Sequence, residues 1–108
     1  MGTYRIYHSS RFDKELLKFD RSFLERVDKI EEQLTENPYV GDPLSVRWFR
    51  EKKIGKNRIY YIIYEDLKAV FMVGISEKKD QQKAINTIRL LLEFFKEELM
   101  SLIDKEEK

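Results

Sequence analysis

Cysteine is absent from this chain, and histidine, proline and glycine are scarce. Without cysteine the protein has neither disulfide bonds nor a thiolate metal site, a composition that fits a reducing cytoplasm. His8 is the only histidine and has no cysteine partner, so a transition-metal site is not indicated. None of the four glycines forms a phosphate-binding loop. The sequence therefore predicts no metal ion, nucleotide or other cofactor.

Long apolar runs are also missing. None approaches the roughly 18 residues that a membrane helix needs, and the N-terminus lacks an apolar signal region. With 42% hydrophobic and 38% charged residues, the 108-residue chain has the composition of one globular domain with a heavily ionised surface. We therefore expect a single cytoplasmic domain over residues 1–108 with no contact to a membrane.

The first third of the chain predicts a strand followed by two helices. Residues 3–8 alternate as in a short strand, and Ser9 or Ser10 supplies the N-cap of a first helix. Asp20 caps a second helix, which ends at Asn37-Pro38 because proline disfavours helical geometry in the residue before it. We expect this antiparallel helix pair to cover one face of a sheet. The predicted core comprises Phe12, Leu16, Phe19, Phe23, Val27, Ile30 and Leu34, packed against Ile59, Tyr61 and Ile63.

The remaining elements complete an α+β fold. Residues 37–46 carry turn signals and predict a loop. A hairpin over residues 47–64 and a nearly continuous apolar strand over residues 69–75 then form a three-stranded antiparallel meander. A long amphipathic helix over residues 80–105 ends the chain.

The most distinctive stretch is the basic hairpin, residues 47–64, in which a turn at Gly55 separates an Arg- and Lys-rich half from an Ile- and Tyr-rich half. Both halves suit a pleated surface. Between residues 47 and 58, six basic side chains accompany a single acidic one, a net charge of +5, whereas the whole chain carries +1. Such a concentration of positive charge favours an anionic partner.

The two sides of the second hairpin strand differ in character. We assign the side of Ile59 and Ile63 to the core, and the side of Arg58 and Tyr60 to solvent and function. Strand alternation supports this division, because successive side chains point to opposite faces of a sheet. The expected working face therefore presents a tyrosine beside an arginine.

The register between the two hairpin strands is left open by the sequence. A loop of even length places Lys53 beside Arg58. A loop of odd length places Lys52 and Arg50 on that side instead. Both arrangements give Arg58 a basic neighbour.

The C-terminal helix has an apolar stripe with alternating spacings of four and three residues. The stripe is wider than a two-stranded seam needs, which favours packing on its own domain. Because the helix is long, we expect the residues beyond about Phe94 to overhang the sheet. The overhanging side chains would then need cover from a second copy, in a homodimer, or from another protein. These side chains are Leu99, Leu102 and Ile103.

The order of these elements resembles the RelE/ParE toxin superfamily over about residues 3–85. The helix pair ends in Asn37-Pro38, and a Gly41-Asp-Pro-Leu44 loop leads into the hairpin. The hairpin motif is Phe49-Arg50…Gly55-Lys-Asn-Arg58-Ile-Tyr-Tyr61, and Lys78-Lys79-Asp80-Gln81-Gln82 follows the last strand. The resemblance implies a RelE-like fold and a toxin that is paired with a cognate antitoxin.

The two branches of this superfamily imply different functions. RelE-type members cut messenger RNA in the ribosomal A site without a metal, whereas ParE-type members inhibit DNA gyrase. In the RNase branch, lysines and arginines on the sheet act together with a tyrosine near the C-terminus. The resemblance and the charge pattern together assign catalysis to Arg58, Lys53 and Lys78, and RNA binding to Arg50, Lys52, Lys56, Tyr60 and Lys79.

Three interpretations of the basic hairpin follow. The first is an RNA-cleaving toxin that acts on ribosome-bound message, since clustered cations stabilise a phosphorane and Tyr60 could stack on a base. The second is a non-catalytic binding protein, either a gyrase inhibitor or an inactive toxin that binds an antitoxin. It is favoured by Glu51, where RNase members have a lysine, and by Lys83-Ala84-Ile85, where they have the tyrosine. In the third, the lysines only protect an edge strand from aggregation.

Overall fold

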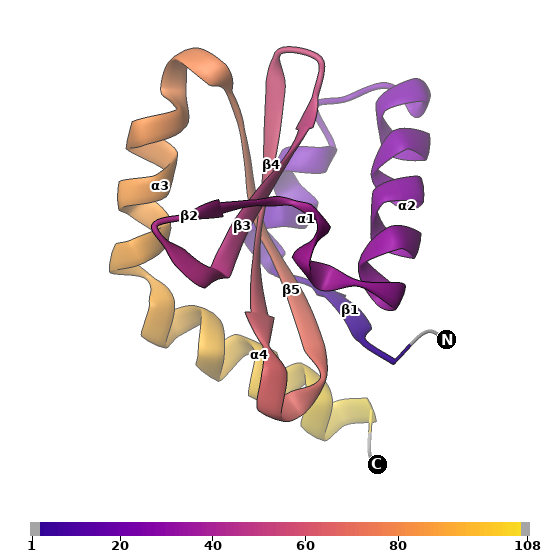
Figure 1. The fold of residues 1–108 in the computed structure, drawn as a ribbon, viewed down its shortest axis with the longest axis vertical. Helices are drawn as coiled ribbons and strands as arrows, with labels where there is room; N and C mark the ends of the chain where they lie inside the picture. Colours follow the sequence, from indigo (N-terminus) through magenta and orange to yellow (C-terminus); the bar gives the residue numbers. More distant parts are fainter. Residues whose placement is uncertain (1–2, 107–108) are drawn as a thin grey trace.

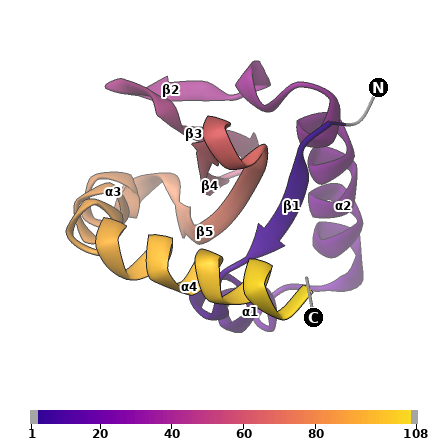
Figure 2. The same ribbon diagram turned by 90° about the horizontal axis from the view of Figure 1, so that it is seen from below.

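The computed structural model describes residues 3–106 as a central sheet with helices on both faces (Figures 1 and 2). Within this range no helix is both long enough and apolar enough to cross a membrane. Three of the elements are short 3-10 turns, labelled η. In chain order the elements are β1 (Arg5–His8), α1 (Ser10–Leu16), α2 (Arg21–Glu36), η1 (Pro38–Val40), β2 (Asp42–Leu44), β3 (Val46–Ile54), β4 (Asn57–Tyr64), η2 (Glu65–Leu67), β5 (Ala69–Glu77), η3 (Lys78–Asp80), α3 (Gln81–Leu90) and α4 (Leu92–Glu106).

The sheet has five strands in the order β1-β5-β4-β3-β2. β3, β4 and β5 form the predicted antiparallel meander, and β1 runs parallel beside β5. The α+β prediction is thus confirmed. The predicted loop over residues 37–46 is more regular than expected, because it holds η1 and the short strand β2. Pro43 is compatible with β2 because this strand lies at the edge of the sheet. An edge strand has a neighbour on one side only, so the N–H group that proline lacks is not needed on the other side.

Local capping begins both N-terminal helices. The Ser9 side chain accepts a hydrogen bond from the backbone N–H of Phe12 at 3.0 Å, and Asp20 accepts one from Phe23 at the same distance. Each bond satisfies a backbone donor that has no partner inside its helix. Of the two candidate caps for the first helix, Ser9 is therefore the one used.

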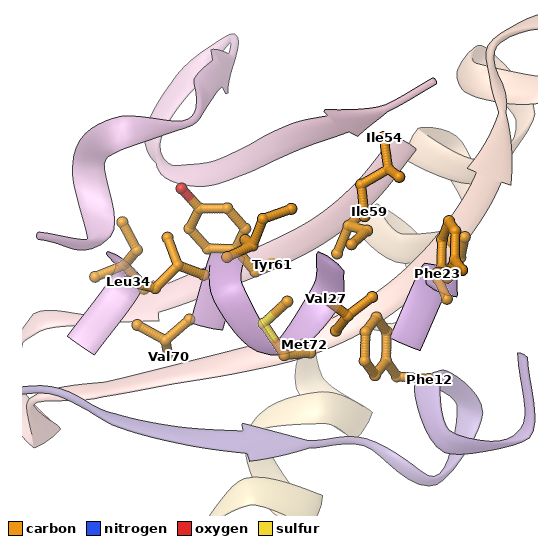
Figure 3. Packing of buried hydrophobic residues seen from close by; sticks show 12 residues of the cluster. Phe12, Phe23, Val27, Leu34, Ile54, Ile59, Tyr61, Val70 and Met72 are labelled. Carbon is orange, nitrogen blue, oxygen red and sulfur yellow. The ribbon is translucent and has the colours of Figure 1, made fainter. Parts of the chain in front are cut away.

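One face of the sheet packs against α1 and α2 (Figure 3). Phe12 and Leu34 are completely buried there, and Val27 is 2% exposed. They meet the side of β4 that carries Ile59 and Tyr61, as predicted. Of the seven residues assigned to this core from the predicted helix pair, five are buried. Leu16 and Phe19 are only partly buried, and Phe19 lies in the turn between α1 and α2.

The other face of the sheet is covered by α3 and α4. The sequence predicted one helix here, but the backbone at Leu91 (φ −104°, ψ 13°) leaves helical geometry and divides the segment in two. Figure 1 shows α4 turning at this break to run across the lower end of the sheet. The expected overhang is therefore wrong: Leu99 is completely buried, and Leu102 and Ile103 are partly buried against the same core.

A histidine ties three of the N-terminal elements together. His8, at the end of β1, has Nδ1 at 2.8 Å from the Asp13 carboxylate of α1 and Nε2 at 2.5 Å from Glu31 of α2. Burial of the ring lowers the His8 pKa, but the hydrogen bonds and charges of Glu31 and Asp13 outweigh it, so the pKa is raised above 6.5. The protonated ring donates to both carboxylates, and the neutral ring cannot.

This arrangement predicts a pH-dependent free energy of unfolding. Because the folded-state pKa is raised, the stabilisation from His8 is fully present below pH 6.5 and is lost as the pH rises through the folded-state value. Urea titrations between pH 6 and pH 9 should show a falling midpoint for the wild type. The His8→Gln variant should lack this component, and equal pH profiles for the two proteins would contradict the assignment.

Candidate nucleic-acid interface

The hairpin turn sets the register of the basic strands. Gly55 and Lys56 form a two-residue connection, and Gly55 has φ 58°, a left-handed conformation that glycine adopts without strain. As a result Lys53 pairs with Arg58 across the hairpin. The even-length alternative left open by the sequence is therefore the observed one, with Lys53 on the same side of the sheet as Arg58.

The last strand delivers two further lysines to this end of the sheet. Ser76 of β5 pairs with Arg58 of β4, and the backbone N–H of Lys78 donates to the Lys56 carbonyl at 2.8 Å. The hairpin turn and the connection from β5 to α3 thus lie at the same end, at the top of Figure 1. We call this surface the basic end; its members are Lys53, Lys56, Arg58, Lys78 and Lys79.

The four lysines of the basic end are exposed and almost free of internal ion pairs. Lys53 has its Nζ 4.0 Å from a carboxylate oxygen of Asp42, at the limit of an ion pair. Within residues 3–106, Lys56, Lys78 and Lys79 form no ion pair. Their charge is therefore available to a partner in solution.

Arg58 differs from these lysines because it is buried, with 6% exposure. One terminal nitrogen donates to the backbone carbonyls of Asn57 at 3.1 Å and Gly55 at 3.4 Å, so the guanidinium braces the hairpin turn. Its Nε has no hydrogen-bond partner among the described residues. A buried donor without an acceptor is costly and is uncommon in native proteins.

Beneath the basic end lies a layer of buried polar groups. Glu51 is 5% exposed, and its carboxylate accepts a hydrogen bond from the Gln81 side chain at 2.6 Å. The Tyr60 hydroxyl lies 2.7 Å from the Ser76 hydroxyl, and burial is the main cause that raises the pKa of Tyr60. No sequence pattern predicted this contact of Gln81, which was noted only as part of the Lys-Lys-x-Gln-Gln segment.

The prediction that Tyr60 faces solvent is wrong. This side chain is completely buried in the core that α3 and α4 form with the sheet, so it has no face on which a base could stack. Alternation correctly separated Tyr60 from Ile59, but both sides of β4 are covered by helices. Periodicity along one strand cannot reveal what packs over it.

Two further residues assigned to RNA binding lie elsewhere. Arg50 donates to the carbonyls of Gly41 at 2.9 Å and Tyr39 at 3.0 Å, which holds the loop before β2 in place. Lys52 pairs with Ile59 and is on the α1–α2 side of the sheet, opposite to Arg58. Neither belongs to the basic end.

This site has the groups to bind an anion but no evident metal centre. Among residues 3–106, no three histidine, aspartate or glutamate side chains gather in a way that could hold a metal ion. The basic end instead offers exposed ammonium groups around one buried guanidinium. This combination suits a phosphate-bearing chain better than a small apolar ligand.

Comparison with known proteins identifies the fold. No protein-family model matches the sequence, and none of the curated proteins does. Among solved structures, a free E. coli RelE toxin variant matches with a TM-score of 0.66 at 17% identity, covering 80% of this chain and 98% of that one. The RelE–RelB complex of Pyrococcus horikoshii matches with 0.64 at 15% identity, covering 70% and 96%. The RelBE2 toxin–antitoxin complex of Mycobacterium tuberculosis matches with 0.62 at 20% identity, covering 70% and 99%.

These similarities agree with the topology described above. The matched structures are covered almost completely, while 20–30% of this chain lies outside each match. At identities of 15–20% the comparison establishes a RelE-like fold. Activity has to be argued from this chain's own residues.

Proposed function

We propose that this chain, which has the fold of RelE toxins, is itself a RelE-like toxin. In this proposal its basic end binds messenger RNA on the ribosome and cleaves it without a metal. The observation that carries the proposal is Arg58, a buried cation beside exposed lysines. Among residues 3–106 it has no ion pair, and its Nε has no hydrogen-bond partner.

The electrostatics of the basic end support an anionic ligand. Positive side chains that share one end of a small sheet repel one another, and a phosphate bound among them would relieve that repulsion. Because the Arg58 Nε is buried, a bound phosphate would contact the exposed lysine ammonium groups, and the Arg58 guanidinium would add a fixed positive charge at the same end of the sheet. The lysines, being flexible, would follow the backbone of an extended strand.

The proposed reaction is a transesterification of the RNA backbone. The 2′-oxygen forms a bond to the adjacent phosphorus as its proton leaves, and the bond from phosphorus to the 5′-oxygen breaks as that oxygen takes up a proton. Negative charge accumulates on the phosphorane oxygens, where fixed cations act most strongly. We assign this stabilisation to Arg58, Lys53 and Lys78, with Lys56 and Lys79 holding the flanking backbone.

An antitoxin is the second proposed partner. Two of the similar structures, from P. horikoshii and M. tuberculosis, are toxin–antitoxin complexes of the RelE–RelB type. We extend this partnership to the present chain: a cognate antitoxin would bind it and suppress its activity. Co-purification with the product of a neighbouring gene would identify that partner.

A non-catalytic binding protein is the second candidate function. It is favoured by the burial of Tyr60 and by the lack of a tyrosine in the segment after Lys79, where α3 carries Lys83 and Ala84. In that case the basic end would bind its target without cutting it, as a gyrase inhibitor or an inactive toxin would.

The test is incubation of the protein with programmed ribosomes in the presence of EDTA, followed by mapping of the message ends. The wild type should produce new ends within the A-site codon. Arg58→Ala should slow cleavage by about a hundredfold, the usual cost of removing one group that stabilises transition-state charge. Lys78→Ala/Lys79→Ala should also reduce cleavage, and it should leave the fold intact because both side chains are exposed.

Arg47→Ala is the matched control. Arg47 is an exposed arginine of β3 whose guanidinium lies 4.2 Å over the Tyr39 ring, outside the basic end. The Arg47→Ala variant should cleave like the wild type. Thermal melting shows whether Arg58→Ala stays folded. If Arg58→Ala is unfolded, the activity of the double lysine variant tests the proposal instead. Bound but uncut message would support the non-catalytic function, and equal activity in all variants would overturn the assignment of this surface.

A further inference from the structure

The outer side of α4 carries an exposed aromatic side chain between two hollows. Phe94 is 53% exposed, although its neighbour Phe95 is completely buried. One hollow, of about 400 Å³, lies between α1 and the start of α4 and includes Leu91 and Phe95 in its wall. The other, of about 380 Å³, continues along α4 to Leu102. Phe94 borders both.

The two hollows have opposite charge at their rims. Lys14 and Arg11 of α1 line the first, whereas Glu97 and Glu98 of α4 line the second. Each rim also holds one residue of the other sign, and Arg11 is paired with Glu15 at 3.8 Å. Lys14 and Glu97 are exposed and form no ion pair within residues 3–106.

The relative position of the two hollows is held by a bond between the helices. The Glu98 carboxylate accepts a hydrogen bond from the backbone N–H of Ser10 at 2.8 Å. This contact joins the first turn of α1 to the middle of α4, and because Phe94 borders both hollows the basic and acidic rims lie on one continuous surface. Figure 2 shows α4 passing over α1 at this place.

From this geometry we propose that a second copy of this chain docks here, forming a two-fold symmetric dimer with Phe94 at its centre. A two-fold axis in the plane of an interface places each side of a surface patch opposite the other side of the same patch. Lys14 of each copy would therefore face Glu97 of its partner. The patch is complementary to itself, which is the charge pattern that an isologous dimer requires.

The charges make a decisive test available. The association constant is measured by sedimentation equilibrium and light scattering on the full chain at micromolar concentrations. Phe94→Ser should weaken association by more than about tenfold, as for a central aromatic anchor. Lys14→Glu and Glu97→Lys should each weaken it by about tenfold, because symmetry makes every change count twice. The double variant Lys14→Glu/Glu97→Lys should recover association to within about threefold of the wild type.

Leu24→Ser is the control, since Leu24 is 37% exposed on α2 and lines neither hollow, and the change should leave association unchanged. Recovery in the double variant distinguishes a second copy from any other occupant. In a dimer of this chain the double variant again places opposite charges at positions 14 and 97 of facing copies, whereas a different protein would still carry its original charges. A wild type that stays monomeric, a dimer that survives Phe94→Ser, or a double variant weaker than either single variant would each overturn the proposal.

Discussion

Replacing Val27 with aspartate should unfold the domain. Val27 is 2% exposed on α2 and packs in the core between the N-terminal helices and the sheet. A carboxylate placed there has no cation to pair with it, and an uncompensated buried charge costs roughly 3–5 kcal/mol. The total stability of a domain is about 5–15 kcal/mol. We therefore expect the loss of most or all of the cooperative thermal transition followed by far-ultraviolet circular dichroism.

Arg26→Asp provides the comparison. Arg26 precedes Val27 in the same helix, is exposed, and receives the same new side chain. Its free energy of unfolding should stay within about 0.5 kcal/mol of the wild type, as is usual for surface substitutions. If Val27→Asp melts like Arg26→Asp, the α1–α2 layer does not pack on the sheet as described.

Removing three lysines from the basic end should abolish most RNA binding. Lys56, Lys78 and Lys79 are exposed and free of ion pairs within residues 3–106, so a triple alanine variant removes charge without breaking an internal ion pair. If each exposed lysine–phosphate ion pair contributes about 1 kcal/mol, affinity for single-stranded RNA should fall about a hundredfold. The slope of log K against log salt should become shallower by about 2, since each neutralised phosphate contributes about 0.7.

A matched variant separates this effect from net charge. Lys29, Lys96 and Lys105 are also exposed lysines, and they lie on α2 and α4 away from the basic end. Their triple alanine variant has the same net charge as the first, but its affinity and salt slope should stay close to those of the wild type. Equal losses in both variants would mean that RNA binding depends only on the net charge of the protein, and that the lysines of the basic end serve solubility.

The hairpin shows how far local patterns reach. Composition and alternation predicted both strands and the turn at Gly55, because these features depend on neighbouring residues. The pairing of Lys53 with Arg58 needed the length of the turn, and the covering of Tyr60 needed α3 and α4. Alternation tells which side chains share a face of a strand, but a face exposed in one fold is a core in another.

The ends of the helices were predictable from local sequence, but the path of the C-terminal helices was not. The sequence alone predicted the cap at Asp20, a cap at Ser9 or Ser10, and the buried stripe of α2, because capping and 3.6-residue periodicity act over a few residues. It did not predict the break at Leu91, which has neither proline nor glycine beside it. A continuous helix satisfies the same periodicity, and what distinguishes the two is the packing of Phe95 and Leu99 against the sheet.

At the basic end, the sequence by itself determined that lysines and arginines would gather around one turn, because charge composition is visible along the chain. Only the tertiary structure decided which of them remain available. Arg50 is bound to the carbonyls of Gly41 and Tyr39, and Arg58 is buried, with an Nε that has no hydrogen-bond partner within residues 3–106. The physical reason is that the hydrogen-bond partners of Arg50 and Glu51 come from residues 9 to 30 positions away, and no local pattern records such a contact.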